Sequence, residues 1–158
     1  MLPTTHIISG LIFSVVLFLF FPQIGFLGLL IIFLSSFLID VDHYFYYVYK
    51  KRDLSLKKSI KWYYLNIEKF KKMSQKQKDN IFMGICLFHG IETIIILFLL
   101  YIISPIFNFL IFIILGFIFH QILDAIELKT KGVGYSKVIS LIYAIHKIKG
   151  KKLLQDLN

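Results

Sequence analysis

The sequence lacks several features that common functional classes require. Its 158 residues include a single cysteine, Cys86, which excludes an internal disulfide framework and is expected to be a small apolar residue within a helix. Nowhere does it contain a Gly-x-Ser-x-Gly nucleophile motif, a glycine-rich phosphate-binding loop or a His-Glu-x-x-His zinc motif. The common serine hydrolase, P-loop nucleotide-binding and zincin classes are therefore not indicated.

Basic residues are absent from two long stretches of the chain. All 18 Lys and Arg lie in residues 50–78 and 129–152, whereas residues 1–49 and 79–128 contain none, and the formal net charge is +9. These basic segments border very apolar ones. Contact with the anionic headgroups of membrane lipids explains such a pattern better than nucleic-acid binding, so no nucleic-acid partner is predicted.

Long hydrophobic runs dominate the rest of the sequence. Hydrophobic residues make up 58% of the chain, with 17 Phe. Four apolar segments stand out, at residues 7–21, 24–39, 81–103 and 106–126. A helix needs ~20 residues to cross the bilayer, so the first two segments suffice only if residues 4–6 and 40–49 continue their helices. The fold class expected is all-α: a polytopic membrane protein of about four transmembrane helices.

The connections between these segments predict the topology. Pro22 separates the first two segments and Pro105 the last two, which indicates two tight helical hairpins. The first segment has no basic residue ahead of it, so a span is expected rather than a signal peptide. With four spans, the basic middle loop and the basic tail lie on the same side, and the positive-inside rule assigns that side to the cytoplasm. We expect a multi-pass cell-membrane protein with both termini cytoplasmic.

The basic stretches show helical periodicity of their own. Ile60, Tyr63, Ile67 and Phe70 recur at helical spacing among lysines, which predicts a cationic amphipathic helix on the membrane surface. A second such pattern runs from Val138 to Ile148. We therefore expect a four-helix transmembrane domain over residues 1–128, with residues 50–79 as a basic amphipathic cytoplasmic loop, and a basic amphipathic tail over residues 129–158.

Ionisable residues inside the apolar segments are the main functional signal. A charged group costs about 2.5–3.5 kcal/mol at the centre of a membrane helix on insertion scales. No Lys or Arg accompanies these residues, so protons or bound cations must neutralise the carboxylates. The candidate metal ligands are His6, Asp40, Asp42, His43, His89, Glu92, His120 and Asp124.

The spacing of these residues suits metal binding. The pairs Asp40/His43 and His89/Glu92 are three residues apart, and His120/Asp124 are four apart, so each pair is expected on one face of a helix. All of them fall in the cytoplasmic half of the predicted spans and are expected to meet in one layer. Histidine together with carboxylate favours one or two divalent ions, zinc first, with manganese or iron as alternatives.

At these residues the chain resembles the YdjM-like family of membrane-bound metal-dependent hydrolases, over roughly residues 4–128. The matching elements are Thr5-His6, Asp40-Val41-Asp42-His43, His89-Gly90-Ile91-Glu92-Thr93 and His120-Gln121-Ile122-Leu123-Asp124. Two departures are visible: Ile39 replaces the proline of the family's Pro-Asp-x-Asp-His element, and the third element lacks the family's Arg and second His, with Glu92 nearby. The resemblance implies metal-dependent hydrolysis and leaves the substrate open.

The preferred function is a membrane-embedded hydrolase acting at the cytoplasmic leaflet on a phosphoester or lipid-linked substrate. Glu92 or Asp42 is the candidate general base, because a carboxylate that is not a ligand can accept a proton from water. The alternative is a non-enzymatic membrane protein with a structural metal site, or one that handles protons or ions. Solvent access separates these functions, since a catalytic metal keeps an open coordination position and a structural one does not.

Overall fold

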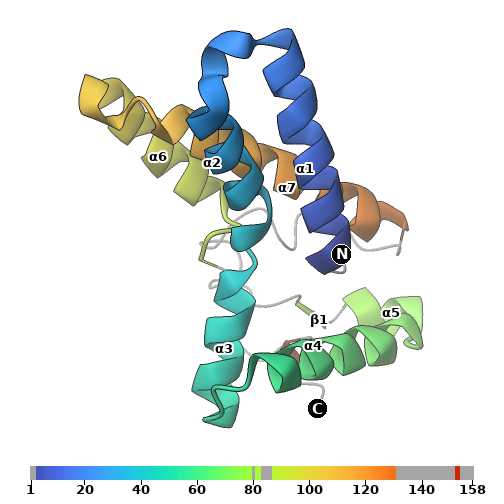
Figure 1. Ribbon diagram of the computed structural model, residues 1–158. Coiled ribbons are helices and arrows are strands. Elements are labelled where there is room, and N and C mark those ends of the chain that lie inside the picture. The colour runs from blue at the N-terminus through green and yellow to red at the C-terminus, as the bar shows by residue number, and fades with distance from the viewer. Residues whose placement is uncertain (1–2, 80, 83–86, 131–151, 154–158) are drawn as a thin grey trace. The chain divides into compact units, whose positions relative to one another are not determined.

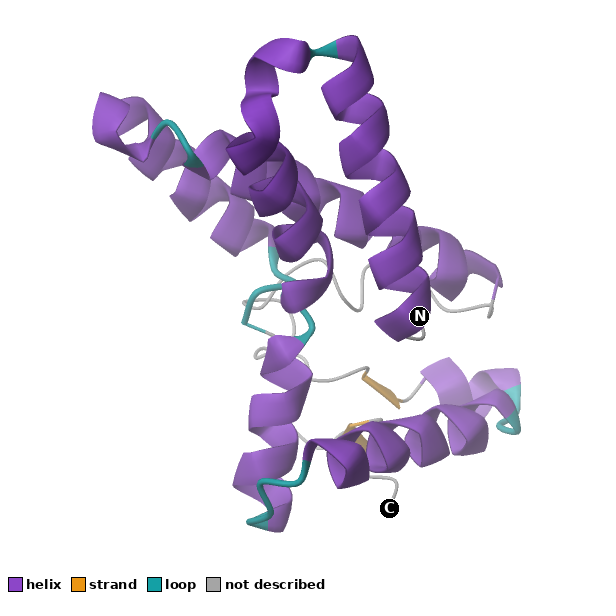
Figure 2. Cartoon of the chain, viewed as in Figure 1, coloured by secondary structure: helices purple, strands orange, loops and turns teal. Residues whose placement is uncertain are grey.

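A computed structural model describes residues 3–79, 81–82, 87–130 and 152–153 (Figure 1). The α-helices are α1 (Pro3–Phe20), α2 (Gly25–Leu38), α3 (Val41–Lys51), α4 (Leu56–Lys71), α5 (Gln75–Asp79), α6 (Ile91–Ile103) and α7 (Leu110–Thr130). Two 3-10 turns, η1 (Pro22–Ile24) and η2 (Pro105–Phe107), join α1 to α2 and α6 to α7. The fold is all-α, as predicted; its only described strands, β1 (Ile81–Phe82) and β2 (Lys152–Leu153), pair in parallel over two residues each (Figure 2).

The chain forms two compact units. The first, called here the apolar unit, comprises residues 1–40 and 91–127, and the second, the basic unit, comprises residues 41–90 and 128–158. All 18 Lys and Arg belong to the basic unit. The predicted division into a domain of residues 1–128 and a tail of residues 129–158 stays a prediction. The amphipathic pattern at residues 138–148 lies outside the described residues.

Small residues let the helices of the apolar unit approach closely. A Cβ on Gly10 of α1 would collide with the Ser36 hydroxyl of α2. One on Gly116 of α7 would collide with the Ser35 hydroxyl and lie 2.7 Å from the backbone oxygen of Ile32. Glycine and serine at helix contacts are typical of helices that pack without a hydrophobic driving force between them. Helix α2 therefore contacts both α1 and α7 through its small residues.

The outer surface of the apolar unit is hydrophobic. Exposed side chains include Phe20 and Phe26 at the α1–α2 turn and Ile103 and Ile106 at the α6–α7 turn. Two helical stretches, Pro22–Lys51 and Leu110–Thr130, are long and apolar enough to cross a membrane, and α1 and α6 are shorter apolar helices. Residues 4–6 extend the first helix, as the length argument required. The second helix is not continuous: α2 ends at Leu38, residues 39–40 form a turn, and residues 41–51 form a separate helix, α3.

The prediction of one helix over residues 81–103 was wrong at the described residues before Ile91. Helix α6 begins at Ile91 and has 13 residues, while Leu87–Gly90 form a turn and Ile81–Phe82 form β1. An apolar run does not by itself distinguish a helix from an extended or turning segment. His89 consequently lies ahead of α6, and the expected helical pairing of His89 with Glu92 on one face does not occur.

Aromatic side chains join α3 to α4 in the basic unit. The Trp62 ring lies with its centroid 5.6 Å from that of Tyr47 and 6.4 Å from that of Tyr46. The hydroxyl of Tyr44 donates to the carbonyl of Leu54 at 2.8 Å across the connecting loop. These contacts hold α3 and α4 together within the basic unit.

The predicted amphipathic helix is present as α4, with a different division of its faces. Ile67 and Phe70 are buried, as is Trp62, whereas Ile60 is exposed. Ser59 and Asn66 are also on the buried face. The side that packs within the protein is thus rotated relative to the predicted apolar stripe. Ser74 and Gln77 form a capping box at the start of α5, with Ser74 N donating to Gln77 Oε1 at 2.9 Å.

Candidate metal centre

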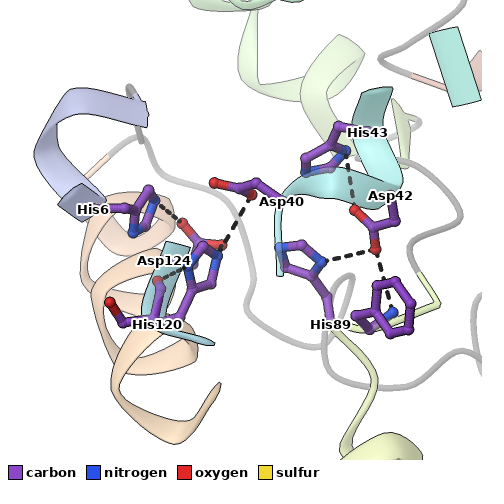
Figure 3. A network of polar contacts seen from close by, with 9 residues as sticks. His6, Asp40, Asp42, His43, His89, His120 and Asp124 are labelled. Carbon is purple, nitrogen blue, oxygen red and sulfur yellow. Dashed lines mark hydrogen bonds and ion pairs between the residues drawn. The ribbon is translucent and has the colours of Figure 1, made fainter. Parts of the chain in front are cut away.

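Four of the predicted ligands meet within the apolar unit. His6 comes from the start of α1, Asp40 from the residues after α2, and His120 and Asp124 from successive turns of α7 (Figure 3). Asp124 bridges the histidines: its Oδ1 lies 3.3 Å from His6 Nε2 and its Oδ2 lies 3.2 Å from His120 Nε2. Asp40 Oδ1 is 3.6 Å from the same nitrogen of His120. These residues are called here the His–Asp cluster.

A backbone carbonyl determines which nitrogen of His120 carries the proton. His120 Nδ1 lies 2.8 Å from the carbonyl oxygen of Ser36. A carbonyl only accepts hydrogen bonds, so Nδ1 must be the donor, and a neutral His120 then carries a lone pair on Nε2. This Nε2 faces the carboxylates of Asp40 and Asp124. Two anionic oxygens beside a lone pair are stable only with a cation or a proton between them. Hydrogen bonding of the other ring nitrogen is the usual arrangement of a histidine ligand.

His6 is the second histidine of the cluster and is almost completely buried. Its side chain is 1% exposed, and within the described residues neither ring nitrogen has a hydrogen-bond partner; the contact of Nε2 with Asp124 does not meet hydrogen-bond geometry. A buried polar atom without a partner is costly and calls for an explanation such as a bound ion. The His6 and His120 rings stack with centroids 4.0 Å apart and planes 18° apart.

The charges of the apolar unit fit a divalent cation. The unit contains the carboxylates Asp40, Glu92, Asp124 and Glu127 and no Lys or Arg. One ligand atom from each of His6, Asp40 and His120 lies within 4.8 Å of the others. Zinc ligands lie about 2.0–2.2 Å from the ion, so atoms sharing one ion are at most ~4.4 Å apart. Small side-chain rotations would bring this set to a common ion, and the residues therefore fit a metal.

A second cluster lies within the basic unit. Asp42, at the start of α3, accepts a hydrogen bond from Phe88 N at 3.2 Å with its Oδ2, and the same oxygen is 3.1 Å from His89 Nδ1. His43 Nδ1 is 3.9 Å from the other oxygen, Oδ1, and its ring contacts those of His89 and Tyr63. Asp42 and His89 are buried. A carboxylate that accepts from Nδ1–H fixes the orientation of the imidazole and leaves the lone pair on Nε2.

Sequence reasoning anticipated the residues of both clusters but missed their supporting groups. The Ser36 carbonyl and the Phe88 N–H are backbone groups, which carry no signal in side-chain spacing. Tyr63 was predicted only as an apolar residue of the amphipathic helix. Glu92 lies partly buried in the first turn of α6. Among the described residues it belongs to none of the groups of potential ligand atoms within 4.8 Å of one another.

The chain was also compared with known proteins. No protein family, curated protein or solved structure matches it.

Proposed function

We propose that this protein is a multi-pass membrane protein whose His–Asp cluster binds a divalent metal ion, and that it is a metal-dependent hydrolase of the cytoplasmic leaflet. One observation carries the proposal: His120 Nε2, with Nδ1 committed to the Ser36 carbonyl, faces the carboxylates of Asp40 and Asp124. The resemblance of the motifs to those of the YdjM-like hydrolases supports the same activity.

The membrane location is supported by length, hydropathy and charge. Two helical stretches are long enough to span a bilayer, and we propose that α1 and α6 complete four spans in two hairpins. The exposed phenylalanine and isoleucine side chains at both hairpin turns suit lipid better than water. Because every Lys and Arg lies in the basic unit, the positive-inside rule assigns that unit and both termini to the cytoplasm.

The His–Asp cluster supplies ligands suited to zinc, with manganese or iron as alternatives. A bound divalent ion acts as a Lewis acid toward a phosphoryl or carbonyl oxygen and makes water acidic enough to provide a nucleophile near neutral pH. His6 and His120 would hold the ion through ring nitrogens, and Asp40 and Asp124 through carboxylate oxygens. The side chains of Asp40 and Asp124 are 25% and 18% exposed, so the carboxylate side of the cluster is more accessible than the buried histidine side.

The remaining predicted residues have supporting roles in this proposal. Asp42 orients His89 through Nδ1 and is itself held by the Phe88 N–H. We therefore assign Asp42 as a positioning residue in place of a general base. Glu92 is left as the candidate proton acceptor, because it is a carboxylate of the apolar unit outside the His–Asp cluster. A phosphoester or lipid-linked substrate suits a chain that combines very apolar helices with lysine-rich segments able to attract an anionic headgroup.

Elemental analysis of the purified protein tests the metal site. The wild type in detergent should contain about one or two equivalents of zinc, manganese or iron. His120→Ala should lose the metal while keeping its elution profile, and His146→Ala, a histidine of the basic segment outside the cluster, should retain it. Wild-type protein that stays metal-free after supplementation would overturn the proposal. A screen of phosphoester lipids with the loaded protein, against His120→Ala, then tests hydrolysis.

A structural metal site is the second candidate, and burial of the histidines favours it. His6 and His120 are 1% and 0% exposed, as expected for a closed site that clamps α1 to α7. In that case chelation would lower the unfolding temperature, and the protein would hydrolyse no substrate of the screen with or without metal. Retained hydrolysis that disappears on chelation and returns with metal would instead support the catalytic role.

A further inference from the structure

Helix α4 carries an apolar stripe that its packing within the protein leaves uncovered. Leu56, Ile60 and Tyr64 follow one another at intervals of four residues and are therefore on one side of the helix. Their side chains are 59%, 50% and 46% exposed. These three residues are called here the outer stripe. Trp62, Ile67 and Phe70 form the buried face, so the apolar sector of α4 is wider than the part that the basic unit covers.

Lysines flank the outer stripe on one side. Lys57 and Lys61 follow Leu56 and Ile60 directly and are exposed. Residues 50–78 contain eleven Lys and Arg against two acidic residues, Asp53 and Glu68. A second copy of the chain would bring these positive charges together, whereas an anionic surface complements them. The combination of an exposed apolar stripe and flanking lysines is that of a helix lying in a membrane interface.

We infer that the outer stripe of α4 docks on the lipid bilayer, with Leu56, Ile60 and Tyr64 inserted among the lipids and Lys57 and Lys61 at anionic headgroups. Leu54, exposed just ahead of the helix, extends the apolar surface. The inference rests on the membrane location in the proposed function and is independent of the metal. It replaces the predicted membrane face, because Ile67 and Phe70 are buried in the protein and do not reach lipid.

Fluorescence quenching in the full-length protein tests this docking. Cys86 is the only cysteine, so Ile60→Cys and Tyr64→Cys in a Cys86→Ser background each accept a single bimane label. Lys69→Cys is the matched control, since Lys69 is an exposed position on another side of α4. The proteins are reconstituted into nanodiscs of phosphatidylglycerol and phosphatidylcholine with brominated acyl chains, and iodide serves as the aqueous quencher.

Labels at residues 60 and 64 should be quenched by brominated lipid at least about twofold more than the label at residue 69, with the opposite order for iodide. Equal lipid quenching at all three positions, or quenching at residue 60 that depends only on protein density, would overturn the inference. Discs of phosphatidylcholine alone should reduce the lipid quenching at residues 60 and 64. Lipid quenching that is the same with and without phosphatidylglycerol would show that Lys57 and Lys61 do not bind anionic headgroups.

A label on the proposed span α7 distinguishes failure of the α4 docking from failure of the membrane location. Ile118, exposed on α7, is labelled in the same way as Ile118→Cys. Lipid quenching at residue 118 without quenching at residue 60 would overturn the docking of α4 and leave the membrane location intact. Absence of lipid quenching at residue 118 would overturn the membrane location, and the docking with it.

Discussion

His120 Nδ1 donates to the backbone carbonyl of Ser36 at 2.8 Å, which links α7 to α2 immediately beside the two aspartates of the His–Asp cluster. The partner is a main-chain atom, so it survives any change of the Ser36 side chain. The Ser36 hydroxyl itself bonds to the carbonyl of Phe33 in its own helix at 2.7 Å. The proton on His120 is thus determined by the path of α2 and not by a particular side chain.

Ser36→Ala should therefore leave the metal content nearly unchanged, whereas His120→Gln should abolish it. The alanine variant keeps the carbonyl acceptor and the Nδ1–H tautomer of His120. The glutamine variant replaces the imidazole by a neutral amide, which is a poor ligand for zinc. Elemental analysis of both proteins, purified in parallel, makes the comparison. Metal loss in Ser36→Ala with normal folding would contradict the assigned role of the carbonyl.

The two aspartates of the cluster should contribute unequally to metal affinity. Asp124 contacts both histidines, at 3.3 and 3.2 Å, whereas Asp40 contacts His120 at 3.6 Å and has the more exposed side chain. Asp124→Asn should thus raise the dissociation constant for zinc at least about tenfold relative to wild type. Asp40→Asn should raise it less. Competition with a fluorescent zinc chelator gives the dissociation constants. The reverse order would identify Asp40 as the principal carboxylate ligand.

Asp42 should matter mainly through His89. Its Oδ2 lies within hydrogen-bond distance of both Phe88 N and His89 Nδ1, and Asp42→Ala removes this shared acceptor. The expected loss of stability is about 1–3 kcal/mol, measured as a lower unfolding temperature in detergent. Imidazole ¹⁵N chemical shifts give a more specific readout: the Nδ1–H tautomer of His89 should dominate in the wild type and lose this preference in Asp42→Ala. An unchanged tautomer would show that another group orients the ring.

The sequence alone was sufficient for the elements that depend on local signals. Pro22 and Pro105 mark the two turns, and the apolar runs on either side of Pro22 became α1 and α2. Helical spacing predicted α4, and the three-residue spacing of Ser74 and Gln77 matches the capping box that begins α5. These features depend on residues that are near one another in the chain, which is why periodicity and capping rules detect them.

Long-range contacts explain what the sequence left undetermined. The segment before Ile91 is as apolar as a helix, but the turn at Leu87–Gly90 is held by the Asp42 carboxylate, 46 residues away from Phe88. The division of α4 into a buried face and the outer stripe likewise depends on the contact of Trp62 with Tyr46 and Tyr47. Side-chain spacing identified the histidines and aspartates, but could not identify backbone partners such as the Ser36 carbonyl.

Gly116→Ala should destabilise the apolar unit, although alanine normally favours a helix over glycine by about 1 kcal/mol. The added Cβ would collide with the Ser35 hydroxyl and lie 2.7 Å from the Ile32 carbonyl oxygen. Overpacking of this kind costs about 1–3 kcal/mol, visible as a lower unfolding temperature in detergent. Ser35→Gly should not restore it, because the Ile32 backbone remains. A stabilised Gly116→Ala protein would show that α2 and α7 are less closely packed.

Asp53 lies outside the proposed spans, and its contacts predict how the stability of the protein depends on pH. The Lys58 ammonium donates to Asp53 Oδ2 at 2.8 Å and Ser55 N to Oδ1 at 2.8 Å, and these hydrogen bonds, with that of Lys58 the stronger cause, hold the pKa of the Asp53 carboxyl below its usual value. A lowered pKa in the folded state means that the stabilisation is present above the unfolded pKa of about 3.9 and is lost as the pH falls through the folded value.

Asp53→Asn should therefore lower the unfolding temperature at pH 7, and the difference from wild type should shrink as the pH falls below about 4. In a Lys58→Gln background the same substitution should have a smaller effect, because the principal hydrogen bond to the carboxylate is already removed. The double-mutant cycle compares the unfolding temperatures of the wild type, Asp53→Asn, Lys58→Gln and the double variant between pH 3 and 7. A difference that stays constant over this range would mean that the carboxylate of Asp53 is not preferentially stabilised in the folded state. In that case the turn before α4 would depend on the Ser55 cap, whose Oγ accepts from Lys58 N at 3.4 Å.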